Sequence, residues 1–384
     1  MVWRRSACGT CMGVPRLPAS ASLKKRAISA TLCTMTVKKD TFQICFLAAC
    51  CLFLSTVEYA VPKPLPFMRL GLANLPVLLS VKKLRARGTL ALTACKVLVQ
   101  ALVGGTMFSY IFVFSVAGSF ASCLAVLLLY CLCGKSGSIS FIGLSLAGSL
   151  ANNAAQLFCS RLMLFGGNTR YIAPLLLGVG LVTGLLLGVF ANLFAHASRW
   201  YAEFGSGETQ LFSVAEPAAV RPSAKGICRA IFALLALALI LLARNPYIVW
   251  GVAAFFFVLP IALHEGRPRI VPALCIVLGV TFFSLLSPFG KVLFRAGSFV
   301  VTQGALESGL HRSGVLTAMV LVSRSVLRRG LHLPGRAGAL ASYILSAFAV
   351  LTSARISFRP GRFISSLDTR LQEARHQLEC GSVQ

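Results

Sequence analysis

The sequence predicts an all-α fold, a polytopic transmembrane helical bundle. Of its 384 residues 57% are hydrophobic and 12% are charged, and the mean hydropathy is +0.81, so the chain has more apolar residues than one soluble core can bury. Apolar runs of about 18–22 residues recur, the length of a helix that crosses ~30 Å of hydrocarbon, without the alternation of barrel strands. We therefore expect about six helices in one membrane block and about five in a second.

The basic residues indicate membrane orientation and not nucleic-acid binding. The formal charge is +27, but Lys and Arg lie mostly in short loops between apolar runs and form no single stripe. The positive-inside rule places such loops, for example residues 82–87, in the cytoplasm. We expect a multi-pass protein of the cell (inner) membrane, surrounded by lipid, with both ends of residues 41–197 in the cytoplasm.

The first block begins after a basic segment. Residues 1–40 contain no long apolar run, so we expect a disordered arm, and Met35 directly before the first apolar run is a candidate start. A six-helix domain is expected over residues 41–197. Its helices are predicted at residues 41–60, 65–81, 89–103, 108–133, 138–164 and 171–196.

The second predicted helix is interrupted by residues that an ordinary membrane span avoids. Gly71 and Pro76 loosen the helical ladder, and freed backbone groups persist in a membrane only where they line a cavity or neighbours satisfy them. Asn74 lies midway along this segment. Arg69 either anchors the segment at the outer interface or meets an anionic group of a ligand.

A polar linker and a second membrane block follow. Residues 198–225 contain no apolar run and are expected to form a cytoplasmic linker. Residues 226–356 are expected to form the second domain, and residues 357–384 a basic, polar tail. Within the second domain we expect an amphipathic interfacial segment over residues 287–312. Its helices are predicted at residues 227–243, 246–263, 270–286, 310–327 and 337–353.

Glycines at four-residue spacing predict one close helix contact. Gly180, Gly184 and Gly188 fall on one face of the sixth predicted helix. Without side chains on that face, a neighbouring backbone can approach closely. We interpret the ladder as a helix-packing motif.

The motifs of common enzymes are missing from the sequence. Cys8 and Cys11 have the spacing of half a zinc site, but no second half follows nearby. The run Cys133-Gly-Lys-Ser ends like a P-loop, but Leu129 stands where that loop needs glycine. With ten acidic residues and no Asp-rich motif, the chain offers no magnesium-diphosphate site. We expect no metal and no cofactor, and a non-enzymatic role is favoured.

Polar side chains within the predicted helices form the candidate site. Charges and amides in hydrocarbon cost about 2–3 kcal/mol each on insertion scales, so they usually face a cavity or a partner. Here they come from several helices at similar depth, with Glu58 and Asn152 nearby, and either a ligand cavity or structural hydrogen bonding between helices explains them. The candidate substrate-binding residues are Arg69, Asn74, Lys96, Gln100, Asn153 and Gln156.

Three stretches of the first block carry a family resemblance. They are RLGLANLPVLL at 69–79, GGTMFSYIFVFSVAGSFAS at 104–122 and GSISFIGLSLAGSLANNAAQL at 137–157. Together they resemble the heptaprenyl diphosphate synthase component I family, also called the Gx transporter family. One departure is Asn152, where the family more often has histidine. The resemblance implies a six-helix fold like the substrate-binding S components of energy-coupling factor (ECF) transporters, which capture vitamins and related molecules.

Residues 289–327 resemble the central part of an ECF transmembrane T component. That resemblance implies ATPase subunits as partners, which dock on short Ala-Arg-Gly or Ala-Arg-Ser motifs. Ser323-Arg-Ser and Ser353-Ala-Arg approximate such motifs. A transporter that imports a small amphipathic solute is the first hypothesis that follows.

Two further hypotheses come from other classes. A membrane subunit of isoprenoid or quinone synthesis would use Arg69 and Lys96 to contact a prenyl diphosphate. A noncatalytic scaffold for membrane redox or flavin proteins would need the polar groups only as links between helices.

Overall fold

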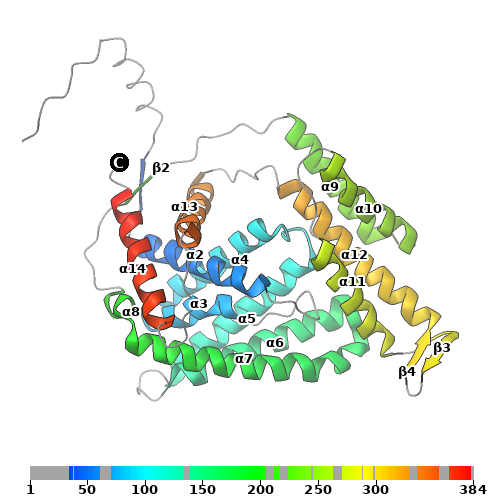
Figure 1. Ribbon diagram of the computed structural model, residues 1–384, viewed down its shortest axis with the longest axis horizontal. Helices are drawn as coiled ribbons and strands as arrows, with labels where there is room; N and C mark the ends of the chain where they lie inside the picture. The colour runs from blue at the N-terminus through cyan, green and yellow to red at the C-terminus, as the bar shows by residue number, and fades with distance from the viewer. Residues whose placement is uncertain are drawn as a thin grey trace, which may run out of the picture.

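The chain folds almost entirely into helices, which confirms the predicted all-α class (Figure 1). The computed structural model describes residues 34–37, 39–60, 71–133, 139–204, 212–215, 224–243, 245–262, 270–287, 289–296, 299–327, 335–353 and 363–381. Four strands form two short antiparallel pairs within these ranges. They are β1 (Thr34–Val37) with β2 (Phe212–Ala215) and β3 (Val292–Ala296) with β4 (Phe299–Thr302).

The long apolar helices embed the protein in a membrane. Four helical stretches among the described residues are long and apolar enough to cross a bilayer, and the last of them contains two consecutive helices. Shorter apolar helices lie in the second block. The four stretches are Thr41–Glu58, Ala86–Gly104, Tyr110–Cys133 and Phe141–Ala197.

The first block contains the predicted helices except for the interrupted second segment. Five long helices lie close to their predicted ranges, and a short helix, α8, follows them within the predicted linker. The bounds are α2 (Lys39–Ala60), α4 (Ala86–Gly104), α5 (Tyr110–Cys133), α6 (Phe141–Ser160), α7 (Thr169–Ala197) and α8 (Arg199–Glu203). A π-helical turn, Arg161–Phe165, extends α6.

The interrupted helix predicted over residues 65–81 is broken in its described part. Its described part begins at Gly71, whose φ of 86° lies in the left-handed region, and continues as the 3-10 turn η1 (Leu72–Asn74) and the six-residue helix α3 (Leu75–Ser80). Pro76 stands in the first turn of α3, where no N–H is needed. Residues 61–70 lie outside the described residues. The described helical part is therefore too short to cross the bilayer alone.

The glycine ladder of α7 packs against α6, as the sequence predicts. A Cβ added at Gly188 would come within 2.6 Å of the Ile142 Cα, and one added at Gly184 would overlap Ser149. This close approach lets the Ser145 hydroxyl donate a hydrogen bond to the Gly184 carbonyl at 2.7 Å. Small residues and polar links of this kind hold membrane helices together.

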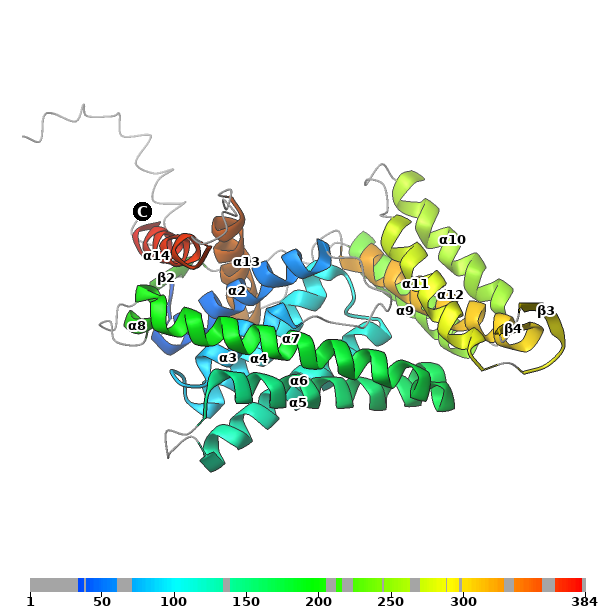
Figure 2. The ribbon, with the colours of Figure 1, turned by 60° about the horizontal axis from the view of Figure 1, so that its bottom comes forward.

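The second block forms a separate group of helices on one side of the first (Figures 1 and 2). The segment predicted to be interfacial, residues 287–312, carries the β3–β4 hairpin and the start of the next helix, which begins at Gln303. The helices are α9 (Ala224–Leu242), α10 (Pro246–Ala262), α11 (Ile270–Leu285) and α12 (Gln303–Leu327).

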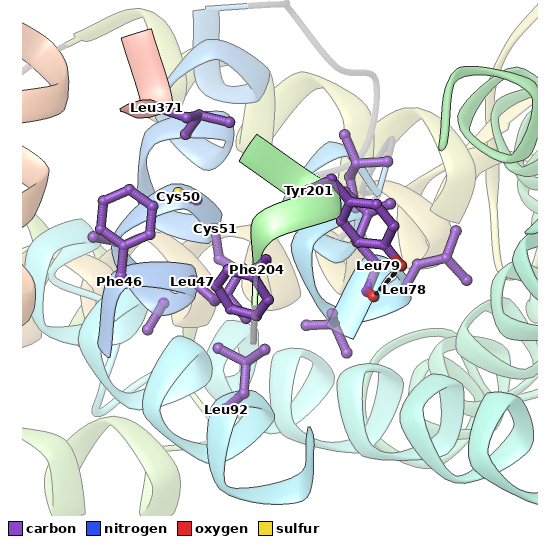
Figure 3. Packing of buried hydrophobic residues seen from close by; sticks show 14 of the residues in the cluster. Phe46, Leu47, Cys50, Cys51, Leu78, Leu79, Leu92, Tyr201, Phe204 and Leu371 are labelled. Atoms are coloured by element: carbon purple, nitrogen blue, oxygen red, sulfur yellow. Dashed lines mark hydrogen bonds between the residues drawn. The ribbon is translucent and has the colours of Figure 1, made fainter. Parts of the chain in front are cut away.

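The last two helices return to the first block. In both views α13 (Gly335–Ser353) lies beside α2, where the Tyr343 and Phe42 rings are 5.8 Å apart (Figures 1 and 2). The predicted polar tail contains a helix, α14 (Phe363–Gly381), whose Leu371 packs beside Cys50 of α2 (Figure 3). The first block therefore completes its core with residues from the far end of the chain.

A buried aromatic cluster and a carboxylate fix α8 in this core. Trp200 is 3% exposed, and the Tyr201 hydroxyl donates to the Leu79 carbonyl at 3.1 Å (Figure 3). Burial raises the pKa of Tyr201 to about 12, so the hydroxyl stays a donor at physiological pH. The Asp368 carboxylate of α14 accepts from the Trp200 backbone N–H at 3.0 Å and from the Ser198 hydroxyl. Asp368 thus caps α8 from a helix remote in sequence.

We expect Asp368→Ala to release α14 from the first block. Loss of a helix cap with charge-assisted hydrogen bonds costs about 1–2 kcal/mol. Thermal unfolding of the detergent-purified protein should show a lower midpoint, and limited proteolysis should remove the C-terminal helix sooner. Thr369→Ala is the matched control, because Thr369 is exposed and its hydroxyl bonds only within its own helix. Equal behaviour of the two variants would contradict the capping role.

Candidate functional site

A cavity lined by polar side chains lies inside the first block. It occupies about 630 Å³ counting its open mouth, and η1, α3, α4, α5, α6 and α7 all contribute to it. Its polar lining residues are Asn74, Thr93, Ser119, Ser122, Ser145, Ser149, Asn152, Asn153 and Thr183.

A buried cation stands beside this cavity. Lys96 of α4 is 3% exposed, and its ammonium donates a hydrogen bond to the Asn74 side-chain oxygen. Because η1 ends at Asn74, the break in the second predicted helix puts this amide within reach of Lys96. A charge in hydrocarbon needs such a partner. The interrupted segment therefore supplies both a cavity wall and an acceptor for the lysine.

Three amides of α6 form a second polar group. Gln156 Nε2 donates to Asn152 Oδ1 at 3.2 Å, and Asn152 Nδ2 donates to Asn153 Oδ1 at 3.3 Å. Asn153 Nδ2 in turn donates to the Leu176 carbonyl of α7 at 3.0 Å. The buried Gln156 Oε1 has no hydrogen-bond partner among the described residues. The chain of amides thus ends on an acceptor that the described helices leave unsatisfied.

Two glycines make room for these amides. A Cβ added at Gly180 would overlap the Asn153 amide, and one added at Gly118 of α5 would overlap Asn152. The ladder on α7 therefore has a second role besides helix packing. It allows Asn153 both to line the cavity and to reach the α7 backbone.

The structure brings some of the predicted site residues together and separates others. Asn74 and Asn153 line the cavity, and Lys96 is joined to it through Asn74. Gln156 is joined to it through Asn152. Gln100 instead donates to the Ser55 hydroxyl of α2, which is a link between helices. Arg69 lies outside the described residues.

Six hydroxyls of the lining are absent from the predicted site. On α5 Ser119 and Ser122 are three residues apart, and on α6 Ser145 and Ser149 are four apart and continue toward Asn152. Such spacing places side chains on one face of a helix. An interpretation of these serines as polar faces of their helices, and not as small packing residues, would have predicted both lining faces from the sequence. Thr93 and Thr183 complete the set and show no comparable sequence pattern.

The fold and this cavity define a polytopic helical membrane protein with a polar site enclosed by its first block. Residues 47–194 match the family model described as heptaprenyl diphosphate synthase component I, so the first block is similar to that family. Residues 226–329 match a domain of unknown function, and this match ends two residues after α12. The searches of curated proteins and of solved structures returned no significant match.

We expect Gly180→Ala to disturb the site and Gly178→Ala to leave it intact. The added methyl at residue 180 overlaps Asn153, and overpacking of this kind costs about 1–3 kcal/mol. At residue 178 of the same helix an added Cβ meets nothing within 4 Å. Thermal unfolding of the two variants in one detergent measures the difference. A midpoint for Gly180→Ala as high as that of Gly178→Ala would show that α6 and α7 do not pack in this way.

Proposed function

We propose that this protein is the membrane subunit of an ECF-type transporter that takes up a small amphipathic, vitamin-like solute. Residues 41–197 capture the solute, residues 198–225 link the domains, and residues 226–356 form the coupling domain. The observation that carries the proposal is the polar cavity inside a membrane-embedded block. Serine, threonine and asparagine side chains from several helices line it, and such groups in hydrocarbon usually serve a ligand or a partner.

The chemistry of the lining suggests the kind of solute. Amides and hydroxyls offer both donors and acceptors, Lys96 adds a positive charge beside Asn74, and the rest of the lining is apolar, including Leu75 and Leu187. A ring system with polar substituents, or an anionic head on a short apolar body, fits these groups.

The contacts of α12 bear on the ATPase partners. Ser323 and Ser325 are buried, and the Ser323 hydroxyl accepts from the Phe108 backbone N–H at 3.2 Å. Arg324 packs against Gly105, in the loop between α4 and α5. The Ser323 motif therefore connects the two blocks. In our proposal this motif relays movement between the capture and coupling domains. The ATPases dock elsewhere, on the cytoplasmic side of the cell membrane. Both ends of residues 41–197 lie on that same side.

A membrane subunit of isoprenoid synthesis is the second candidate. The family description names a component I, which implies a partner component in a heptaprenyl diphosphate synthase. Lys96 beside the cavity is the observation in its favour, because an ammonium suits a diphosphate. Prenyl transfer by the native complex that is lost in Lys96→Ala, without any solute uptake, would favour this candidate over transport.

Copurification and transport test the first proposal. The native complex, isolated through a tag on this chain, should contain ATPase subunits, and vesicles made from the same cells should take up the co-purifying small molecule only with ATP. Native mass spectrometry of the purified protein identifies that molecule. A complex without ATPases, together with vesicles that show no ATP-dependent uptake, would exclude the ECF assignment.

Cavity variants should separate ligand binding from helix linking. Ser119 and Ser122 line the cavity without a hydrogen-bond partner among the described residues. We expect Ser119→Ala with Ser122→Ala to reduce the co-purifying molecule about fivefold, with an unchanged unfolding midpoint. Asn74→Leu should reduce it by about 5-fold to 150-fold and also lower the midpoint, because Lys96 loses its acceptor.

The opposite pattern would contradict a ligand site. If the polar groups only link helices, the serine variant should keep all of the bound molecule, and Asn74→Leu should change stability alone. Both quantities are measured on one preparation of each variant.

A further inference from the structure

A second cavity lies where α13 and α14 return to the first block. It occupies about 600 Å³ counting its open mouth, and nearly all of its lining is apolar. The helix α3 lies between it and the polar cavity, with Leu78 lining the polar cavity and Leu79 lining this one. Its walls include Leu47 and Phe53 of α2, Phe194 of α7, Leu351 of α13 and Leu371 of α14.

Two polar groups interrupt this apolar lining. Arg370 of α14 lines the cavity, and its guanidinium bonds the Glu373 carboxylate at 2.8 Å in a half-exposed pair. Trp200 also lines it, and its indole Nε1 is buried without a hydrogen-bond acceptor among the described residues. The cavity therefore offers a cation and an unsatisfied donor to whatever enters it. Both groups belong to the elements joined by Asp368, namely α8 and α14.

The same end of the first block carries the basic loop. Lys83 donates to the Ala202 carbonyl of α8 at 3.2 Å and lies 5.0 Å from the Tyr201 ring centre. Lys82 lies over the Phe141 ring, and Arg85 and Arg87 are exposed. Clusters of cations next to a membrane helix attract anionic lipid head groups. The Trp200 end of the cavity therefore lies near these basic side chains.

We propose that this cavity binds one acyl chain of an anionic phospholipid from the leaflet on the side of the basic loop. The chain fills the apolar space between α2, α7 and the two C-terminal helices. The phosphate pairs with Arg370, and the ester region supplies the acceptor that Trp200 lacks. The bound lipid then links α14 to the first block, in addition to the Asp368 cap. This site is independent of the function proposed for the polar cavity.

Lipid titration of the full chain tests the site. The protein is purified in detergent, delipidated, and titrated with phosphatidylglycerol or with phosphatidylcholine of the same acyl chains, and bound lipid is counted by native mass spectrometry. We expect one phosphatidylglycerol to bind in preference to phosphatidylcholine. Arg370→Gln should weaken phosphatidylglycerol binding about fivefold and leave phosphatidylcholine unchanged.

Glu373→Gln is the matched variant with the opposite expected sign. It removes the carboxylate that competes for Arg370, so phosphatidylglycerol binding should become tighter. Both side chains are half-exposed, so these variants are expected to fold. Equal phosphatidylglycerol binding by wild type, Arg370→Gln and Glu373→Gln would overturn the proposal.

A volume test locates the chain. Leu367 lines the cavity and is only partly buried, and Leu367→Trp should fill the space and reduce bound phosphatidylglycerol. Leu345→Trp on α13, which is 40% exposed and outside the lining, should bind lipid as wild type does. Unchanged binding by a folded Leu367→Trp would place the lipid elsewhere and overturn the site. Preferential binding of a polyprenyl phosphate over phosphatidylglycerol in the same titration would overturn the phospholipid assignment.

Discussion

The close approach of α6 and α7 is the contact on which the rest of the first block depends. Hydrocarbon drives two apolar helices together only weakly, so their association relies on backbone proximity and on hydrogen bonds. The α7 glycines provide the proximity, and Ser145 and Asn153 of α6 donate to two α7 carbonyls across it. The same contact sets the position of Asn152 and Asn153 at the cavity. Packing and site geometry are therefore determined by one interface.

The polar cavity and the apolar cavity show two uses of a broken helix. At η1 the chain leaves regular helical geometry, which turns Asn74 toward Lys96. Immediately afterwards α3 presents leucines on its other side to the C-terminal helices. In a continuous helix over the same residues, successive side chains would point in regularly spaced directions around the axis, toward lipid as well as toward neighbouring helices. The short α3 instead separates a cavity with polar side chains in its lining from a cavity whose lining is nearly all apolar.

Much of this structure could be predicted from the sequence, because a membrane restricts the choices. The spans α4, α5, α6 and α7 follow from apolar length, and the contact of the α7 glycines follows from their spacing. The amides and Lys96 could be recognised as a candidate site because polar groups in hydrocarbon are costly. Their partners were not, because the choice between Ser55 and the cavity for Gln100 depends on helix rotation.

Long-range packing was beyond the reach of sequence patterns. Apolar periodicity groups α13 with the helices that precede it, yet its Ile344 and Ala347 pack into the first block. The C-terminal segment 363–381 is polar enough to suggest a tail. Its apolar face becomes buried only because the helix docks against α2 and α8. Hydroxyls such as Thr93 carry no pattern of their own, so only the fold identifies them as lining.

The return of α13 and α14 gives the chain an unusual order of assembly. The helix α2 precedes every other described helix during synthesis, yet two of its neighbours come from beyond residue 334. Until then, Phe42 of α2 lacks the Tyr343 ring of α13, and Cys50 lacks Leu371 of α14. The helices α9–α12 are made in between and occupy a separate site against α5. Maturation of the first block is thus linked to synthesis of α13 and α14, because a chain that stops early leaves this block without the two helices that complete its core.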